Sequence, residues 1–170
     1  LFIDETRVGD IVEDALGRFR AAADARGITL KSVGESGIVV AGDRRQITSA
    51  LGNLIDNAVK YSPDGATVTV SARVNPSGLA LSVADTGDGI PSRDLDRVFE
   101  RFYRVDRARS RETGGTGLGL AIVRHVAHNH GGEVSVRSKE GQGSEFTLVL
   151  PLGTDVVEPE SPVDDSEVSA

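Results

Sequence analysis

Residues 53–90, with the sequence NLIDNAVKYSPDGATVTVSARVNPSGLALSVADTGDGI, combine the patterns that decide the fold. The first part belongs to a predicted helix that begins near Asp43, an acceptable N-cap, and runs to Tyr61. The Ser-Pro-Asp-Gly sequence that follows ends this helix. Residues 67–74 and 79–83 alternate apolar and polar side chains around an Asn-Pro-Ser-Gly turn, which predicts an antiparallel pair of strands.

The rest of the chain extends this alternation of helices and strands. The other expected elements are helices over residues 7–26 and 118–129, strands over 28–33 and 38–41, a short helical segment with Leu95, Val98, Phe99 and Phe102 on one side, a loop over 105–117, and a final hairpin over 133–138 and 145–150. Together they predict an α+β fold, a two-layer α/β sandwich with a mixed, mostly antiparallel sheet covered by helices on one face. The polar positions Thr67, Thr69, Ser71 and Arg73 are expected on the solvated face.

Composition places the chain among ordinary globular proteins. It has 170 residues, 38% of them apolar, and no cysteine, so disulfides, thiolate metal sites and cysteine nucleophiles are excluded. No apolar stretch approaches the roughly 20 residues of a membrane span, and no secretory leader is seen. The chain starts at Leu1 and contains no methionine, so we expect it to be a piece of a longer protein.

The negative charge is concentrated at the C-terminus. Residues 153–170 carry six carboxylates and no lysine or arginine, which accounts for six of the seven net negative charges. The nearly neutral body offers no basic field for nucleic acid, so no nucleic-acid partner is expected. We therefore expect one domain over residues 1–152 and an acidic, disordered tail over 153–170.

Three groups of polar or glycine residues indicate a binding site. The first is Asn53, Asn57 and Lys60, which share one stripe of the second predicted helix. Asparagine is unfavourable inside a helix, two amide oxygens one turn apart suit Mg²⁺, and lysine supplies a charge for phosphate. Taken alone, the stripe is also compatible with a solvated helix face.

The second group is the sequence DTGDGI over residues 85–90, at the end of a strand. Its alternate glycines let the backbone approach a ligand closely, and Asp85 can accept a proton from a ligand amine. A simple acidic turn would have the same sequence.

The third group is GGTGLGL over residues 114–120, leading into a helix. Free amides at a helix N-terminus bind anions, phosphate above all. The sequence lacks the Gly-Lys-Ser/Thr ending of a P-loop, and Ile122 stands where a dinucleotide fingerprint needs glycine. An anion site of another type and a flexible hinge both remain open.

In their order along the chain, these groups resemble the ATP-binding domain of bacterial sensor histidine kinases. That family shares its nucleotide-binding fold, the Bergerat fold, with DNA gyrase, mismatch-repair ATPases and a heat-shock chaperone. The five matching motifs cover the N box at 53–61, the first glycine box at 85–91, the F box at 99–104, the second glycine box at 115–120 and a last box at 141–146. The resemblance extends over residues 1–152.

The resemblance implies roles around Mg-ATP. Asn57 would hold Mg²⁺ with assistance from Asn53, and Lys60 would contact phosphate. Tyr61 would lie against the adenine or its ribose, and Arg104 would reach the γ-phosphate. The implied catalytic residues are thus Lys60 and Arg104.

The glycine boxes would bind the two ends of the nucleotide. Asp85 would accept the exocyclic amine of adenine, and Gly87 and Gly89 would allow that approach, with Ile90 beside them. Residues 105–117 would form a mobile lid over ATP. The phosphate-binding residues implied in the second box are Thr116, Gly117, Leu118, Gly119 and Leu120.

The residue at position 53 separates two classes within the superfamily. The hydrolytic members have a glutamate there, whereas Asn53 cannot act as a base at neutral pH. Asp56 points about 100° away from Asn57 and is a poor substitute. The expected function is therefore a protein-histidine kinase domain. The alternatives are a stand-alone ATPase or a serine-directed anti-sigma kinase, and a degenerate nucleotide-binding scaffold is less favoured.

The resemblance also implies partners outside this chain. Neither His128 nor His130 stands in a phosphoacceptor sequence, and His125 is expected on the buried side of its helix. The acceptor histidine would lie on a missing dimerisation domain, and phosphate would pass on to a response regulator in two-component signalling. We expect the fragment to be a monomeric cytoplasmic domain without membrane contact, and its parent to be a homodimer anchored in the bacterial plasma membrane.

Overall fold

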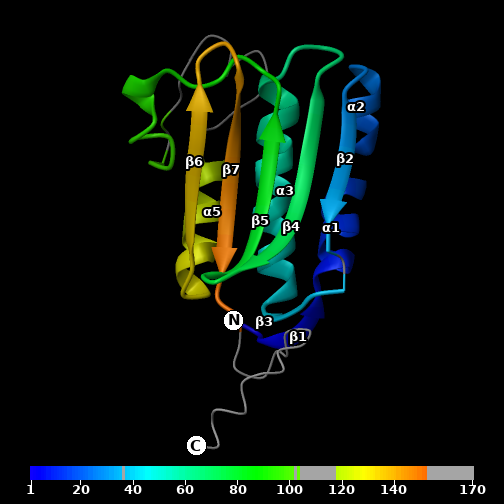
Figure 1. The fold of residues 1–170 in the computed structure, drawn as a ribbon, viewed down its shortest axis with the longest axis vertical. Helices are drawn as coiled ribbons and strands as arrows, with labels where there is room; N and C mark the ends of the chain where they lie inside the picture. The colour runs from blue at the N-terminus through cyan, green and yellow to red at the C-terminus, as the bar shows by residue number, and fades with distance from the viewer. Residues whose placement is uncertain (36, 102, 104–117, 153–170) are drawn as a thin grey trace, which may run out of the picture.

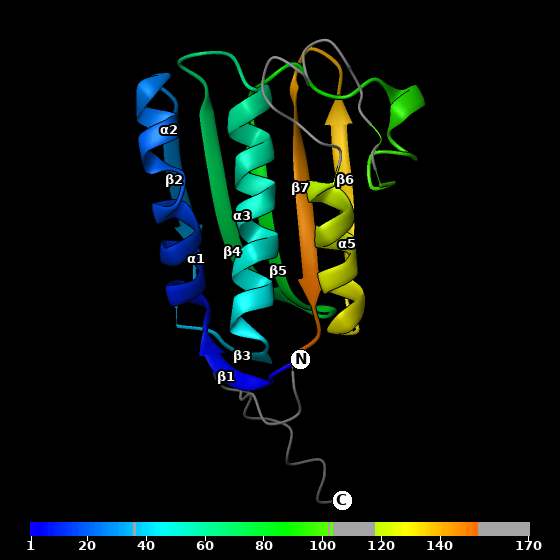
Figure 2. The same cartoon turned by 180° about the vertical axis from the view of Figure 1, so that it is seen from behind.

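The computed structural model describes residues 1–35, 37–101, 103 and 118–152, which form two layers (Figure 1). One layer is a five-stranded sheet in the order β2-β4-β5-β7-β6, and the other consists of helices (Figure 1). Figure 2 shows these helices side by side over one face of the sheet, and Figure 1 shows that no described helix covers the opposite face. The predicted α+β sandwich is confirmed.

The sheet is mixed and mostly antiparallel, as predicted, because β2 pairs with β4 in parallel and every other pairing is antiparallel. Its strands are β2 (Thr29–Gly34), β4 (Thr67–Asn75), β5 (Gly78–Asp85), β6 (Glu133–Lys139) and β7 (Gly143–Leu150). The helices are α1 (Val8–Gly17), α2 (Arg20–Ala25), α3 (Arg44–Tyr61), α5 (Gly119–Asn129) and the short 3-10 helix η1 (Ser92–Asp94). A separate ribbon pairs β1 (Asp4–Arg7) with β3 (Val39–Gly42).

The hydrophobic core lies between the layers. Along β4, Val68 and Val70 are fully buried, whereas Thr67 and Thr69 on the other face are partly exposed. Leu51, Leu54 and Ile55 on α3 are also fully buried. Alternation in the strand and helical spacing in α3 therefore direct apolar side chains into one shared core.

The N-terminal segment differs from the prediction of one helix over residues 7–26. The helix stops at Gly17, and a new helix, α2, begins at Arg20. A glycine is costly inside a helix, and here the break places the Phe19 ring against Gly52 of α3. Strand β1 was not predicted, because its four residues show no alternation of apolar and polar side chains and directly precede the first helix.

Two further expectations need correction. The segment around Leu95 forms only η1 and turns, with Val98 buried, and Phe102 lies outside the described residues. His125 and Ile122 are exposed rather than buried. Helix α5 buries Val123, Val126 and Ala127 instead, a set with i, i+3, i+4 spacing that packs against the sheet and α3.

Other expectations concern parts of the chain that are not described. The predicted loop over residues 105–117 and the tail over 153–170 lie outside the described residues. Among the helices that the structure does describe, none combines the length and the apolar character needed to cross a membrane.

The N-terminus of α3 is fixed by Asp43, the predicted N-cap. Its Oδ1 accepts the Gln46 amide at 3.1 Å, and its Oδ2 accepts the Phe2 amide at 2.9 Å. The Asp43 amide donates to Nε2 of His130 at 3.0 Å, and Nδ1 of the same ring donates to the Val126 carbonyl at 2.9 Å. His130 thus joins the end of α5 to the start of α3, which is a structural role.

Replacing Asp43 by alanine is expected to lower the free energy of unfolding by about 1 kcal/mol at neutral pH. The amides of Phe2 and Gln46 hold the pKa of Asp43 below its ordinary value of 3.8. A carboxyl with a lowered pKa in the folded state stabilises the fold above its ordinary pKa, and this contribution is lost as the pH falls through the lowered value. Urea unfolding near pH 7 and near pH 3 should show the difference between the two proteins shrinking in acid. An equal difference at both pH values would contradict the assignment.

Candidate functional site

The candidate site lies where the C-terminal half of α3, the end of β5 and the N-terminus of α5 meet (Figure 2). Helix α3 turns Leu54, Ile55 and Ala58 into the core, which leaves Asn53 and Asn57 half-buried on the adjoining stripe. The first two groups singled out from the sequence, and residues 118–120 of the third, are therefore brought to one end of the molecule.

The first contact joins the N box to the second glycine box. A Cβ atom added at Gly119 would lie 3.7 Å from Oδ1 of Asn53. The first residue of α5 therefore lies beside the side-chain amide of Asn53. Leu118 is the N-cap of α5, and the Leu120 side chain packs against the core, so the backbone of these residues is what they can offer a ligand.

Lys60 forms an ion pair that the sequence analysis missed. Its Nζ lies 3.1 Å from a carboxylate oxygen of Asp56, one helical turn earlier, and both side chains are about one-third exposed. The i, i+4 spacing of an acid before a lysine is the signal that could have found it. The pair draws the ammonium group towards Asp56, and the group's three N–H donors allow further acceptors.

Asp85 is the last residue of β5, and its carboxylate is held by two hydrogen bonds. Its Oδ1 accepts the amide of Gly87 at 2.9 Å, and its Oδ2 accepts the hydroxyl of Ser144 at 3.2 Å. Burial raises the pKa of Asp85, while the hydrogen bonds from Gly87 and Ser144 act in the opposite direction. A carboxylate has about four lone-pair sites, so acceptor capacity remains for a ligand amine. Ser144 belongs to the matching last box but was not singled out.

Gly87, in the turn that follows β5, packs closely against the end of α3. A Cβ atom there would lie 3.0 Å from Oδ1 of Asp85, 3.1 Å from the Tyr61 carbonyl and 3.2 Å from Oγ of Ser62. Any side chain would therefore displace the Asp85 carboxylate or the last turn of α3. The absence of a Cβ is what allows the two elements to approach so closely.

The β6–β7 turn supports the rest of the first glycine box. Gly89 has a φ of 77° and packs against the backbone of Lys139, which leaves no room for a side chain. The Ile90 amide donates to Oγ of Ser138 at 2.7 Å, and the Gly141 amide donates to the Asp88 carbonyl at 2.6 Å. The end of β6 and Gly141 of the last box thus hold the first glycine box in place.

The start of the F box is fixed on the sheet. The Phe99 ring packs edge-on against Phe146 of β7, with 5.8 Å between centroids. The Tyr103 hydroxyl donates to the buried carboxylate of Asp94, and the Arg97 guanidinium lies 4.5 Å from the Tyr103 ring centroid. The remaining predicted site residues, Arg104, Thr116 and Gly117, lie outside the described residues.

The donor set fits magnesium bound together with a nucleotide. In the described part of the chain, no three His, Asp or Glu side chains are grouped around a possible metal position. Asn53 and Asn57 supply amide oxygens, which are hard donors of the kind that Mg²⁺ accepts. Two protein oxygens leave most of an octahedral shell to phosphate and water, the usual arrangement for Mg²⁺ beside a nucleotide.

Comparison with known proteins agrees with this geometry. Residues 42–154 match the family described as histidine kinase-, DNA gyrase B- and HSP90-like ATPase. The sensor-like histidine kinase SenX3 of Mycolicibacterium smegmatis is 46% identical over 165 residues, covering 97% of this chain and 42% of SenX3. The structure of the mycobacterial sensor histidine kinase MprB superposes with a TM-score of 0.78 at 32% identity, covering 88% of this chain and 98% of MprB. Full-length ShkA in complex with AMPPNP gives a TM-score of 0.80 at 29% identity, covering 92% of this chain and 32% of ShkA.

The chain thus spans less than half the length of SenX3, while it matches nearly all of the MprB chain. These relatives are sensor histidine kinases, which favours the expected kinase class over a stand-alone ATPase or an anti-sigma kinase. By its matched region and its fold, the chain belongs to the histidine kinase-, DNA gyrase B- and HSP90-like ATPase family, as an ATP-binding catalytic domain of the sensor histidine kinase type.

Proposed function

We propose that this domain binds Mg-ATP and supplies the γ-phosphoryl group to a histidine on a separate helical domain. The observation that carries the proposal is the meeting of three motifs at one end of the fold. Asn53 lies beside Gly119, and Gly87 lies beside the end of α3 and the Asp85 carboxylate, with no room for a side chain at Gly87. The ShkA structure, with AMPPNP bound, supports a nucleotide as the ligand.

The adenine end of the site would be formed by Asp85 and its neighbours. The Asp85 carboxylate, fixed by Gly87 and Ser144, would accept the exocyclic amine of adenine. Gly87 and Gly89 would let the base approach the backbone, with Ile90 beside them, and Tyr61 would lie against the base or ribose.

The phosphate end would be formed by α3 and the N-terminus of α5. Asn57, with Asn53, would hold Mg²⁺, which when bound would neutralise part of the phosphate charge. Lys60 would add a positive charge. The backbone amides of 117–120 would donate to phosphate oxygens, as helix N-termini do. Thr116 would lie beside them, and Arg104 would stabilise the γ-phosphate charge.

Catalysis by this domain would consist of positioning and charge neutralisation, with the base supplied from elsewhere. Asn53 has an amide where hydrolysis would require a carboxylate, and it cannot accept a proton from water. Asp56 is engaged with Lys60 at 3.1 Å. ATP held here would therefore be stable until an acceptor histidine arrives.

The partners of the proposed reaction lie outside this chain. They are a dimerisation domain carrying the acceptor histidine and a response regulator that receives the phosphoryl group. We propose that the fragment is a monomer and a cytoplasmic domain, and that its parent is a homodimer anchored in the plasma membrane. SenX3, with more than twice the length of the matched region, leaves room for such additional domains.

The experiment that tests the proposal is a comparison of ATP and GTP binding in the presence of Mg²⁺ by isothermal titration calorimetry. ATP should bind at least 50-fold more tightly, because guanine presents a carbonyl where adenine presents an amine and would face the Asp85 carboxylate with an acceptor. Equal affinities would contradict the adenine assignment, and no binding of either nucleotide would contradict the proposed function.

A further inference from the structure

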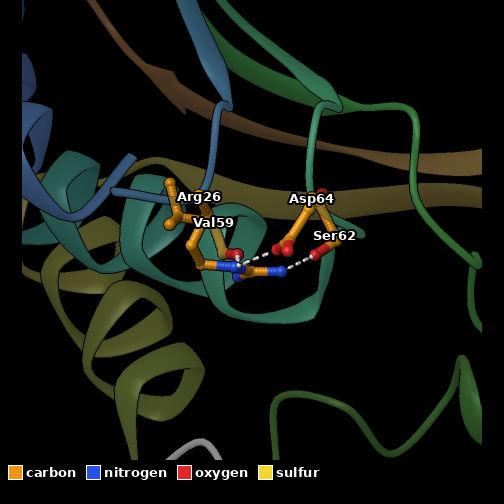
Figure 3. Close-up of polar contacts among 4 residues, drawn as sticks. All are labelled: Arg26, Val59, Ser62 and Asp64. Atoms are coloured by element: carbon orange, nitrogen blue, oxygen red, sulfur yellow. Dashed lines mark hydrogen bonds and ion pairs between the residues drawn. The ribbon is translucent and has the colours of Figure 1, made fainter. Parts of the chain in front are cut away.

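Arg26, the C-cap residue of α2, spans the gap to the last turn of α3 (Figure 3). Its Nε donates to Oδ1 of Asp64 at 2.9 Å. The two terminal nitrogens of the guanidinium donate to the backbone carbonyls of Val59 and Ser62. Figure 3 shows the planar group surrounded by these three acceptors.

These contacts cap the C-terminus of α3. The last four carbonyls of a helix have no partner within the helix, and the negative end of its dipole favours a cation. Arg26 satisfies the Val59 carbonyl and places its charge at this end. Its backbone also takes part, because the Arg26 carbonyl accepts the Gly65 amide at 3.0 Å. The loop after α3 is therefore bonded both to the guanidinium of Arg26, through Ser62, and to its backbone carbonyl, through Gly65.

The segment held in this way includes Lys60 and Tyr61, which lie between the two bonded carbonyls of Val59 and Ser62. Ser62 is fully buried, and its Oγ has no hydrogen-bond partner among the described residues, so hydrogen bonding of its side chain does not fix it there. A Cβ atom added at Gly87 would meet the Tyr61 carbonyl and Ser62 Oγ as well as Asp85 Oδ1, so Gly87 lies close to this segment. A shift of this turn would therefore reach the Asp85 carboxylate through Gly87.

We propose that Arg26 is a positioning residue for nucleotide binding, which sets the last turn of α3 against the Gly87 turn so that Lys60 and Asp85 are correctly spaced for one ligand. The proposal rests on the proposed function. Arg26 itself touches no ligand in this scheme; it acts through the carbonyls of Val59 and Ser62.

The test measures Mg-ATP affinity and melting temperature for Arg26→Ala and for a matched variant, Asp43→Ala. Asp43 caps the opposite end of the same helix, so both variants lose a cap of α3 and both should melt at a lower temperature. At a temperature where both are folded, Arg26→Ala should bind Mg-ATP about 10-fold more weakly, whereas Asp43→Ala should bind as the unmodified chain does.

Two further variants separate the contacts of the guanidinium. Asp64→Ala removes only the ion pair between Arg26 and a carboxylate that is 80% exposed. The affinity of this variant for Mg-ATP should stay within about 2-fold of that of the unmodified chain. Arg26→Lys keeps the positive charge but lacks the planar guanidinium that donates to two carbonyls at once. We therefore expect its affinity for Mg-ATP to fall by about 3-fold, between the other two variants. This variant also serves as the test if Arg26→Ala fails to fold.

The outcomes are distinguishable. If the unmodified chain binds ATP and folded Arg26→Ala binds it equally well, the positioning role alone is overturned. Where Arg26→Ala does not fold, unchanged affinity for ATP in Arg26→Lys has the same meaning. Equal loss of affinity in Arg26→Ala and Asp43→Ala would show a general effect of destabilising α3 and would also overturn it. Failure of the unmodified chain to bind ATP would overturn the proposed function and this inference with it.

Discussion

Replacing Asp85 by asparagine is expected to weaken ATP binding by at least 100-fold while the domain stays folded. The carboxylate would offer only acceptors to the adenine amine, whereas the asparagine amide group would place N–H donors near it. The loss of a charge-assisted hydrogen bond, with a donor left facing a donor, corresponds to roughly 3 kcal/mol. The fold should survive because asparagine retains an oxygen for the Gly87 amide, and the Ser144 hydroxyl can accept as well as donate.

Asp88→Asn is the matched control for this variant. Asp88 lies in the same turn and loses the same charge, but its side chain is exposed. Its affinity for ATP should change by no more than about 3-fold. Calorimetry on both variants, with circular dichroism to confirm the fold, makes the comparison. Wild-type affinity in Asp85→Asn would refute the adenine assignment.

Replacing Asn57 by alanine is expected to remove the dependence of ATP binding on Mg²⁺. In the unmodified chain, chelating Mg²⁺ should weaken ATP binding by about 10- to 100-fold, because the phosphates would then face the site without a bridging cation. In Asn57→Ala, the amide oxygen is missing from the half-buried stripe of α3, so affinities with and without Mg²⁺ should converge.

Asn129→Ala provides the control for Asn57→Ala. The Asn129 amide donates to Oε1 of Gln46 at 3.1 Å, near the opposite end of α3. This variant should keep the full effect of Mg²⁺. Titrations with Mg²⁺ and with a chelator measure all three proteins, and an undiminished Mg²⁺ effect in Asn57→Ala would place the metal elsewhere.

The sequence predicted those parts of the fold that depend on local pattern. Helix α3, the β4–β5 pair and the β6–β7 hairpin have clear periodicity and are bounded by strong turn sequences. Their positions in the structure agree with the prediction to within about two residues. The sheet type and the single covered face followed from the same patterns.

The parts that could not be predicted depend on contacts between distant segments. The break between α1 and α2 places Phe19 on Gly52, and β1 exists because β3 pairs with it. His125 is exposed because α5 is rotated to bury Val123 and Val126. A helical pattern alone does not reveal which neighbours are available to cover a face.

In the candidate site, too, some features follow from local sequence and others depend on contacts between distant segments. Asn53, Asn57 and Asp85 were predicted as binding residues from residue type and spacing, and the structure places them on α3 and at the end of β5. Their support was not visible in the sequence. Ser144 and Arg26 reach the site across more than thirty residues of chain, through contacts that only the fold creates.

The most direct test of the central claim is to incubate the chain with Mg²⁺ and ATP labelled at the γ-phosphate, and to follow bound nucleotide and free phosphate together. The account predicts that ATP is retained intact with negligible phosphate release, because Asn53 provides no base for an attacking water. Steady release of phosphate that is lost in Asn57→Ala would show a hydrolase and contradict the assignment as a kinase domain.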